Sequence, residues 1–600
     1  MRGRLPASKT AFVLVIAFLA GCAAPAATHL QNGATDPAAA GFSHVAVFPG
    51  AYDLSKNSHT LVAGTLSILP GEVTKIKSKL DGADIEIGFI RPDTKDPVPV
   101  IVDASPYYAP LTPQNLDKQV IAPLMVPDFV PHGYAYALVS VRGTGDSGGC
   151  MDFLGPSERA DVDQAVTWLG TQNWSNGNVG LIGISYDGST PWEAAAMGNP
   201  HLKTIVPSEG INDYFQLDYR NGTPNGFGLG TEFEGYWAAP LVNAPVSGIT
   251  PTNFPARAAC PESMKAGVGQ AESAAMGDRD ALGFWAARNL RPDVLSKYNG
   301  SVFIVEGFKD DNVDPAQPYP LAERMAANGV RVKHLLGQWG HQWPGSKPTS
   351  GTALRADWNE MLLHWFDHEL KGIATADVGP VAEVQDSAGQ WRVENAWPPA
   401  DAKDTTFYLA TGGKLSNDKP TTSDAQLATM LLPVPPGQGW APGDAWEYPA
   451  STMCAACPTF ATAPFAKEFR FAGLPRVHVT VTPAGPGGYL AAFLYAQDAS
   501  GKLTQLGMGG GIDLRFADGS ETMTPIIPGM PLVAKMELEP MDAVVPAGSK
   551  LVLVLHQGGY GDHLPPPDTF PVQVQTGEKS TLTLRAFERP DPSVFFSVPK

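Results

Sequence analysis

The sequence has few basic residues for its size, few cysteines and no long hydrophobic run. Its 600 residues include 42 Lys and Arg against 60 Asp and Glu, which gives a formal net charge of −18. Because phosphate binding requires a basic surface, this balance argues against nucleic acid as a partner. The apolar run TAFVLVIAFLA at residues 10–20 is too short to span a membrane as a helix of the mature protein. With 43% hydrophobic and 17% charged residues, the chain is typical of a globular protein with roughly two to four domains.

The N-terminus has the pattern of a targeting segment. A basic stretch, MRGRLPASK, precedes the short apolar run, and LAGC then ends at Cys22. LAGC resembles a bacterial lipobox, which implies cleavage before Cys22 and lipid attachment to its thiol. A plain secretory signal cut nearby at an A-x-A-like site is the alternative. We therefore expect a lipoprotein signal peptide at 1–22, a flexible tether at 23–45, and an exported bacterial lipoprotein that contacts the membrane only through this anchor.

The cysteine count is consistent with export. Five cysteines are an odd number, but lipidation of Cys22 leaves four. Cys454 and Cys457 lie in C-A-A-C, close enough to bridge, so Cys150 and Cys260 form the remaining candidate pair. A redox or metal role for C-A-A-C would need a second ligand pair or a thioredoxin-like context, and the sequence has neither. We expect two disulfides.

The order of apolar and polar segments divides the rest of the chain. Strand-like runs such as IEIGFIRP and YAYALVSVRG alternate with helical patterns and end in polar loops, which predicts a doubly wound α/β domain at 46–211 and 299–375. Residues 212–298 lose the alternation and are rich in Gly, Ala, Pro and aromatics, which indicates a mostly helical cap over the site. At 380–600, short alternating strands between Pro and Gly turns predict a jelly-roll β-sandwich.

The stretch LIGISYDG at 181–188 places a serine between an apolar strand and a helix start. The helix start has cap-type residues followed by Pro191. A tight strand-to-helix turn exposes Ser185 at the top of the sheet, as in the nucleophile elbow of α/β-hydrolases. Asp187 stands where G-x-S-x-G has its second glycine, and Gly188 follows one place later. An ordinary turn with a capping serine is the alternative.

Two further segments supply a base and an acid in the right order. A serine becomes a nucleophile when a base takes its proton and a carboxylate orients that base, and α/β-hydrolases carry them in the order Ser, Asp or Glu, His. SVFIVEGFKDDNV offers Asp310 and Asp311 after a strand, and KHLLGQWGHQWPG offers His341 after the next one. His364 and His368 have the i, i+4 spacing of zinc ligands, but they lack H-E-x-x-H and a third ligand, so we expect no metal.

The oxyanion of a tetrahedral intermediate needs hydrogen-bond donors. The backbone N–H of Tyr186, directly after the serine, is one candidate. The segment SPYY follows an early strand and offers Tyr107 and Tyr108 as the second. Aromatic packing is the alternative for both tyrosines.

The chain resembles Xaa-Pro dipeptidyl-peptidases and the related cocaine-esterase-like hydrolases over roughly residues 75–600. The segments that carry the resemblance are SPYY, VRGTGDSGG, NGNVGLIGISYDG, LKTIVPSEGINDYF, GFKDDNV, GQWGHQWP and LLHWFDHELKG. In that family G-x-S-Y-x-G is normal. The resemblance implies an α/β-hydrolase fold with a helical cap insertion, followed by an all-β jelly-roll sandwich. It implies Ser185 as nucleophile, His341 as base, Asp310 of G-x-x-D as acid, and the phenol of Tyr107 as an oxyanion donor beside the Tyr186 N–H.

The substrate class follows from two finer matches. SYDG and DNVDPAQ are closer to the peptidase branch, and a dipeptidyl-peptidase must bind a free amino terminus and a proline ring. Buried carboxylates would pair with the ammonium, and apolar side chains would take the ring. The candidate carboxylates are Glu209, Asp213, Asp218, Glu232 and Glu234, and the candidate apolar walls are Tyr214, Phe215, Trp237 and Trp343.

We therefore expect a serine hydrolase of Xaa-Pro dipeptidyl-peptidase type that works through an acyl-enzyme, without a cofactor, on a small peptide. Hydrolysis of a carboxylic ester or amide, as by cocaine esterase or α-amino-acid ester hydrolase, is the alternative. A glycan-binding surface protein with an inactive hydrolase domain is a third hypothesis, which the intact Ser, Asp and His argue against. Activity should fall below roughly pH 6–7 as His341 protonates.

Overall fold

The computed structural model describes residues 61, 63–225, 283–345, 354–428, 457–519, 521–560, 563, 565–566 and 568–598. The predicted signal peptide with Cys22, the tether and most of the predicted cap lie outside these residues. In the described part of the chain, no helix is both long and apolar enough to cross a membrane.

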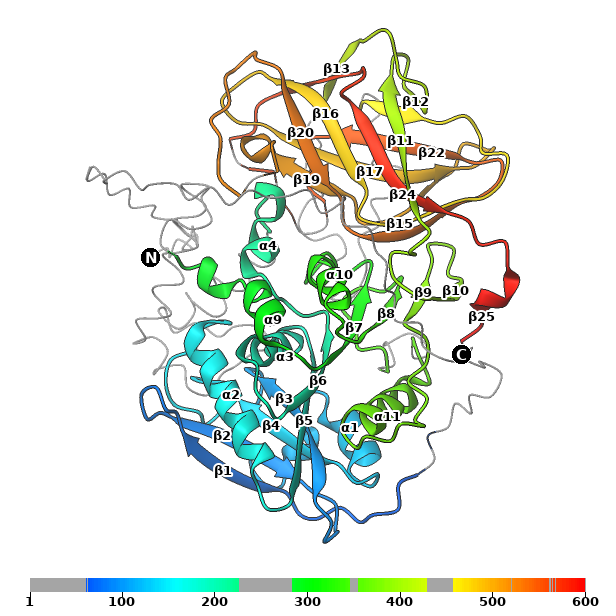
Figure 1. The fold of residues 1–600 in the computed structure, drawn as a ribbon. Helices are drawn as coiled ribbons and strands as arrows, with labels where there is room; N and C mark the ends of the chain where they lie inside the picture. Colours follow the sequence, from blue (N-terminus) through cyan, green and yellow to red (C-terminus); the bar gives the residue numbers. More distant parts are fainter. Residues whose placement is uncertain are drawn as a thin grey trace, which may run out of the picture. The chain divides into compact units, whose positions relative to one another are not determined.

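An eleven-stranded sheet forms the first part of the fold (Figure 1). Its strands are β1 (Glu72–Lys77), β2 (Asp84–Ile90), β3 (Val98–Ser105), β4 (Ala135–Ser140), β5 (Ser175–Ile184), β6 (Leu202–Ser208), β7 (Ser301–Gly307), β8 (Val332–Gly337), β9 (Ala382–Gln385), β10 (Trp391–Glu394) and β25 (Phe595–Phe596). They lie in the order β1-β2-β4-β3-β5-β6-β7-β8-β9-β10-β25. Pairing is parallel from β4 through β9, so the carboxyl ends of these strands open at one edge. The predicted doubly wound α/β sheet is confirmed.

Helices cover both faces of this sheet (Figure 1). They are α1 (Ala122–Phe129), α2 (Pro156–Gly170), α3 (Tyr186–Met197), α4 (Tyr214–Asp218), α9 (Arg291–Lys297), α10 (Tyr319–Ala327) and α11 (Trp358–Glu369). Val100 and Val102 of β3 pack in the core with α2, α3, α9 and α10, whereas Ile101 packs in the core with α1 and α11. Because successive side chains of a strand point to opposite faces, a strand covered on both sides is apolar throughout. This explains why the strands read as continuous apolar runs.

The second part is a β-sandwich of antiparallel strands with one short parallel pairing. Its strands are β11 (Lys403–Ala410), β12 (Lys414–Ser416), β13 (Ala425–Ala428), β14 (Thr459–Ala461), β15 (Phe469–Gly473), β16 (Arg476–Pro483), β17 (Tyr489–Gln497), β18 (Leu503–Gln505), β19 (Gly510–Asp513), β20 (Leu532–Glu537), β21 (Met541–Val545), β22 (Lys550–His556), β23 (Val572–Gln575) and β24 (Thr581–Phe587). Burial alternates strictly along β16, RVHVTVTP, as expected for a strand with one face in the core. The predicted all-β C-terminal domain is confirmed.

The boundary between the two parts differs from the prediction. We place the start of the sandwich at residue 380, but β9 and β10 belong to the first sheet, and β25 pairs with β10 after the sandwich is complete. The reason is burial. Ala382 and Val384 of β9 pack against side chains of the α/β part, and β9 forms backbone hydrogen bonds with β8. Short strands of this kind give no sequence signal of the sheet to which they belong.

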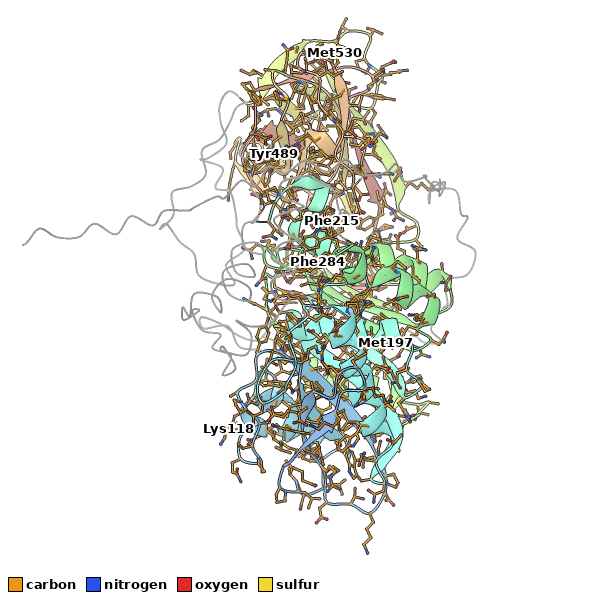
Figure 2. All side chains as sticks on the ribbon, turned by 90° about the vertical axis from the view of Figure 1, so that its left-hand side faces the viewer. Lys118, Met197, Phe215, Phe284, Tyr489 and Met530 are labelled. Atoms are coloured by element: carbon orange, nitrogen blue, oxygen red, sulfur yellow. The ribbon has the colours of Figure 1, made fainter. Side chains whose placement is uncertain are left out.

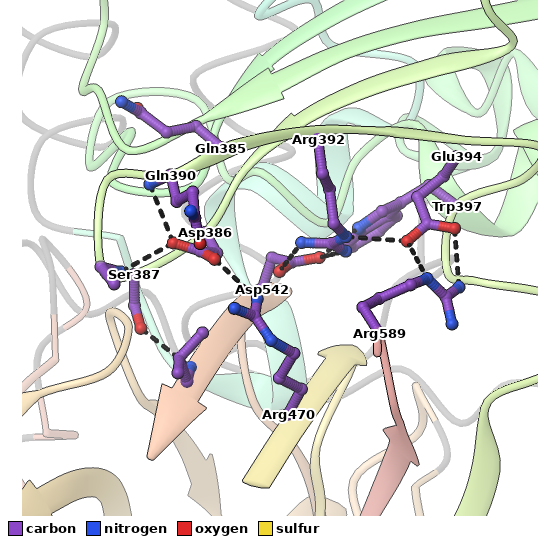
Figure 3. A network of polar contacts seen from close by, with 12 residues as sticks. Gln385, Asp386, Ser387, Gln390, Arg392, Glu394, Trp397, Arg470, Asp542 and Arg589 are labelled. Atoms are coloured by element: carbon purple, nitrogen blue, oxygen red, sulfur yellow. Dashed lines mark hydrogen bonds and ion pairs between the residues drawn. The ribbon is translucent and has the colours of Figure 1, made fainter. Parts of the chain in front are cut away.

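A network of buried ion pairs lies where β9 and β10 meet the sandwich (Figure 3). Arg392 of β10 is fully buried and donates two N–H groups to Asp542 of β21, each at 2.6 Å. The indole N–H of Trp397 donates to the same carboxylate at 3.0 Å. Arg470 of β15 donates to Asp386, which follows β9, at 2.7 Å. Each of these buried charges therefore has an opposite charge and a hydrogen bond, which is the condition for tolerating it.

Candidate active site

Ser185 lies at the turn between β5 and α3. Its backbone has φ 67° and ψ −128°, a region that costs a non-glycine residue conformational energy. The turn is tight on both sides: a Cβ at Gly183 would lie 2.3 Å from the carbonyl oxygen of Asp187, and one at Gly188 would lie 2.1 Å from that of Ser208. The N–H of Ser185 donates to the same Ser208 oxygen at 3.1 Å. The chain thus has the strained elbow that the motif predicts.

Asp310 and His341 follow β7 and β8 and form a hydrogen-bonded pair. Nδ1 of His341 lies 2.8 Å from Oδ2 of Asp310. The other oxygen of Asp310 accepts the backbone N–H groups of Asn312 and Val313 at 2.9 and 3.0 Å, so the carboxylate is fixed in the loop. Asp310 is fully buried, whereas the His341 side chain is 17% exposed. Of the two adjacent aspartates left open by the sequence, Asp310 is the one placed at the imidazole.

The surroundings of His341 make it a stronger base. Burial alone would lower the pKa of His341, but the charge and hydrogen bond of Asp310, with the charge of Asp311, outweigh burial and raise it above its usual value. Because Nδ1 is engaged by Asp310, Nε2 is the nitrogen left for proton transfer. The parallel strands β5, β7 and β8 bring Ser185, Asp310 and His341 to the same edge of the sheet.

Glu209 is a second acid at this pair. It follows β6, is fully buried, and has a strained φ of 48°. Its Oε1 accepts the indole N–H of Trp339 at 3.0 Å, and its Oε2 lies 3.2 Å from Nδ1 of His341. The expectation that Glu209 binds a substrate ammonium is therefore corrected: the carboxyl is buried on the Asp310 side of the imidazole. The sequence signal that could have placed Glu209 beside His341 is its position directly after Ser208, at the carboxyl end of β6.

Ligand atoms of Glu209, Asp310 and His341 lie within 4.8 Å of one another, close enough to hold a cation. Burial, and then the charge of Asp310, raises the pKa of Glu209 well above its usual value. A raised pKa favours the neutral form of Glu209 and so lowers the negative charge beside His341.

The two tyrosines of SPYY have different surroundings. Tyr108 is buried and donates its phenolic O–H to the carbonyl oxygen of Asp103 at 3.1 Å, so it is a core residue. Tyr107 is half-buried and lies edge-on to the ring of Tyr186, with centroids 6.4 Å apart. The phenol of Tyr186 donates to Glu158 at 2.7 Å. Tyr107 is therefore the SPYY tyrosine beside the residue that follows Ser185.

Aromatic side chains gather around Tyr186. Tyr214 stacks on Phe153 at 6.2 Å, and Trp285 packs against Tyr214 and Phe215 at 5.4 and 5.7 Å. Phe215 and Phe284, labelled in Figure 2, belong to this cluster, as does Val313 of the loop that carries Asp310. Tyr214 and Phe215 are buried in this cluster, and their role as walls of a substrate pocket stays a prediction.

Other predicted pocket residues lie elsewhere. Trp343 is buried in the core that contains α1 and α11, edge-on to Trp358 at 5.4 Å, and it is not part of the aromatic cluster around Tyr186. Its role as a pocket wall stays a prediction. Asp213 forms an ion pair with Arg291 at 3.4 Å. Asp218 is buried. Trp237, Glu232 and Glu234 lie outside the described residues.

Cysteine pairing is described in part. Cys150 and Cys457 are each disulfide-bonded. Cys260 and Cys454 lie outside the described residues, so the proposed pairing stays a prediction.

The loop that carries Asp310 is held from the β-sandwich, a feature that the sequence analysis missed. Nε2 of His563 lies 3.1 Å from the carboxylate of Asp314, and both side chains are buried. Nδ1 of His563 lies 3.0 Å from the carbonyl oxygen of Thr223. Next to this pair, Arg220 forms a 2.7 Å ion pair with Glu539. Residues of the sandwich thus fix the loop between β7 and α10 only a few positions from Asp310.

Comparisons with known proteins agree with this architecture. Residues 81–343 match the family model of the X-Pro dipeptidyl-peptidase (S15 family), and residues 377–586 match that of the X-Pro dipeptidyl-peptidase C-terminal non-catalytic domain. A putative Xaa-Pro dipeptidyl-peptidase of Streptomyces avermitilis is 28% identical over 546 residues, which cover 79% of this chain and 75% of that protein. The cocaine esterase of a Rhodococcus species is 26% identical over 412 residues, covering 62% and 67%.

Solved structures of low sequence identity share the fold. A CocE/NonD family hydrolase from Staphylococcus aureus superimposes with a TM-score of 0.67 at 17% identity, covering 91% of this chain and 100% of that one. An α-amino acid ester hydrolase gives a TM-score of 0.65 at 18% identity, covering 90% and 100%.

Proposed function

Because the chain belongs to the S15 family of X-Pro dipeptidyl-peptidases and cocaine-esterase-like hydrolases, and is a serine hydrolase, we propose that it releases Xaa-Pro dipeptides from free peptide amino termini. The observation that carries this proposal is the Asp310–His341 hydrogen bond at the sheet edge where Ser185 occupies a strained elbow. The peptidase names of the relatives and the DNVDPAQ segment favour the peptide substrate.

The reaction begins with attack of the Ser185 hydroxyl oxygen on the carbonyl carbon of the prolyl residue. Nε2 of His341 takes the hydroxyl proton, and Asp310 holds the imidazole and stabilises its charged form. The carbonyl oxygen becomes an oxyanion, for which the Tyr186 N–H and the Tyr107 phenol are the proposed donors.

Collapse of this intermediate breaks the peptide bond, and His341 returns the proton to the leaving amine. The dipeptide remains as an ester of Ser185. Water attacks the ester as His341 takes one of its protons, and His341 then passes that proton to the departing Ser185 oxygen. The dipeptide leaves as a carboxylic acid, which releases its proton to solvent.

The aromatic cluster supports the choice of a prolyl residue. A pyrrolidine ring is compact and apolar, and binding sites for such groups are lined by aromatic and aliphatic side chains. Tyr186, Tyr214 and Val313 belong to one apolar cluster that includes the residue next to Ser185 and the loop of Asp310.

Hydrolysis of esters or amides of other acids is the second candidate, which the cocaine-esterase relative favours. The two are separated by turnover of Ala-Pro-arylamide, of its N-acetylated form and of simple aryl esters. Cleavage of the free arylamide but not of the acetylated one supports the peptidase, whereas ester turnover without arylamide cleavage refutes it. Ser185→Ala should lose at least about 10³-fold activity. Ser500→Ala, an exposed serine of the sandwich, is the matched control.

We also propose export as a lipoprotein anchored through Cys22, on the basis of LAGC after the short apolar run. Incorporation of an alkyne-labelled fatty acid into the wild-type protein, and its loss in Cys22→Ser, is the expected result. Equal labelling of both proteins would refute the anchor.

A further inference from the structure

Two carboxyl groups contact one nitrogen of the catalytic imidazole. Nδ1 of His341 lies 2.8 Å from Oδ2 of Asp310 and 3.2 Å from Oε2 of Glu209. Both acids are fully buried, so neither is shielded by water. A triad needs only one acid at Nδ1. The role of the second is therefore open.

Glu209 is held firmly in this position. Its backbone N–H donates to the carbonyl oxygen of Val305 in β7 at 3.0 Å, and its Oε1 accepts the Trp339 indole N–H at 3.0 Å. The preceding residue, Ser208, accepts the N–H of Ser185. The backbone of Ser208 and Glu209 is thus bonded to the elbow of β5 and to β7, and the Glu209 carboxyl is bonded to Trp339 in the loop that leads to His341. A carboxyl held on such a backbone and by a second hydrogen bond is suited to orienting the imidazole.

Charge decides the protonation of the pair. Two buried carboxylates beside one another do not both ionise, because each charge disfavours the other and burial disfavours both. The titratable groups that face Glu209 are Asp310, His341 and, from β7, the buried Glu306. Asp310 accepts two backbone N–H groups, and burial raises the pKa of Glu209 well above its usual value, so we place the shared proton on Glu209.

We propose that Glu209 is a second acid of this site, a positioning residue that shares one proton with Asp310 and orients His341 itself when Asp310 lacks its carboxylate. In the native enzyme, protonated Glu209 supports the ionised Asp310. When Asp310 is replaced by Asn, Glu209 loses its proton to solvent, and its carboxylate accepts the Nδ1–H of His341. This inference rests on the proposed function only for the roles of Ser185 and His341.

The test compares Asp310→Asn, Glu209→Gln and the double variant on an aryl ester, a substrate common to peptidases and esterases. Loss of a triad acid without a substitute costs roughly 10⁴-fold in kcat. We expect Asp310→Asn to lose only about 10²-fold, the double variant about 10⁴-fold, and Glu209→Gln alone less than about tenfold. An Asp310→Asn variant as inactive as the double variant would overturn the inference.

Two controls separate orientation of His341 from a general effect of buried charge. Glu306→Gln in the Asp310→Asn background removes an equally buried acid of β7 and should stay within about threefold of Asp310→Asn. Glu209→Asp in the same background shortens the side chain, cannot reach Nδ1, and should match Glu209→Gln. Thermal unfolding of every variant, with phosphonate titration of Ser185, verifies that folded sites are compared.

The pH profile gives a readout that a structural role would not change. In Asp310→Asn, activity should require ionised Glu209 and rise with pH over a range where the native enzyme is already fully active. In Glu209→Gln, the pH at which activity falls on the acid side should be the same as in the native enzyme, because a neutral amide replaces a neutral acid. A fall displaced to lower pH would mean that Glu209 carries charge in the resting enzyme, and the proposed shared proton would be wrong.

A failure of this test is distinct from a failure of the proposed function. If wild type cleaves Ala-Pro-arylamide while Asp310→Asn and the double variant are equally inactive, the peptidase proposal stands and the second acid does not. If only esters are cleaved and the variants follow the expected series, the second acid stands and the peptidase does not.

Discussion

Replacing Asp542 by asparagine should strongly destabilise the junction between the first sheet and the sandwich. In the network of Figure 3, Asp542 accepts two N–H groups of Arg392 and the indole N–H of Trp397. Asparagine has nearly the same shape as aspartate but no charge. Its NH₂ group replaces one of the two carboxylate oxygens, so one N–H of Arg392 faces a donor in place of an acceptor. Arg392 is fully buried and keeps its charge, because Asp542 and Glu394 outweigh the effect of burial and raise its pKa above the usual value.

The expected loss follows from the burial of both partners. Removing one partner of a buried ion pair costs about 3–5 kcal/mol. Arg392 keeps its 2.7 Å ion pair with Glu394, so the loss should lie near the lower end of this range. At roughly 2–4 °C per kcal/mol for a domain of this size, a loss of about 3 kcal/mol should lower the unfolding midpoint by roughly 6–12 °C. Asp404, whose partner Arg476 is on the surface, provides the control. Asp404→Asn should cost less than about 1 kcal/mol, since exposed pairs contribute little.

The assay is thermal unfolding of wild type, Asp542→Asn and Asp404→Asn at one pH and one salt concentration. The double variant Arg392→Met/Asp542→Leu removes both charges and should recover part of the loss. Glu394 keeps its ion pair with Arg589, but the Trp397 indole N–H loses its acceptor. A midpoint of Asp542→Asn within a degree or two of Asp404→Asn would refute the reasoning, and so would a double variant less stable than Asp542→Asn.

Three further predictions concern the site. Tyr107→Phe should lower kcat by about 10²–10³-fold with little change in KM if its phenol is an oxyanion donor, whereas an unchanged kcat would leave the ring a packing role only. The acid limb of kcat/KM should lie above pH 6.5, because the pKa of His341 is raised above that value and the base must be neutral; a limb well below pH 6 would contradict this. Burial alone would lower the pKa of His563, but the charge and hydrogen bond of Asp314 outweigh burial and raise it. The stability that this pair contributes should therefore be full at low pH and should be lost as pH rises through the raised pKa. The difference in unfolding midpoint between wild type and His563→Gln, measured from pH 5 to 9, should therefore shrink with pH, and a difference that grows would refute the pairing.

The parts of the fold that sequence predicts are those coded by local pattern. The elbow at Ser185 can be predicted because strand, glycine and helix-start residues are adjacent in the sequence. Asp310 and His341 can be predicted because each lies in the loop that follows an apolar strand. The sandwich is visible because its strands alternate, as RVHVTVTP does along β16. In each case, the signal lies within about ten residues of the chain, the length of a typical strand or turn.

The parts that sequence does not predict depend on distant contacts. Asp314 and His563 are 249 positions apart, and neither segment marks the other. Trp343 is a candidate pocket wall by its residue type, but it packs in the core with α1 and α11 and not in the cluster around Tyr186. Glu209 is a candidate substrate ligand because it is one of several carboxylates near the predicted cap, whereas the position of its carboxyl depends on Trp339, which lies 130 residues away in the chain.

The return of β25 to β10 makes the whole sandwich an insertion within the first sheet. Phe595 pairs with Arg392 and Phe596 with Trp391, so the chain leaves the sheet and re-enters it at one edge. During synthesis that edge stays without its neighbour until the intervening domain has been made, and an open edge is a site where other chains add strands. The period between translation of β10 and translation of β25 should therefore be when a chaperone is most needed.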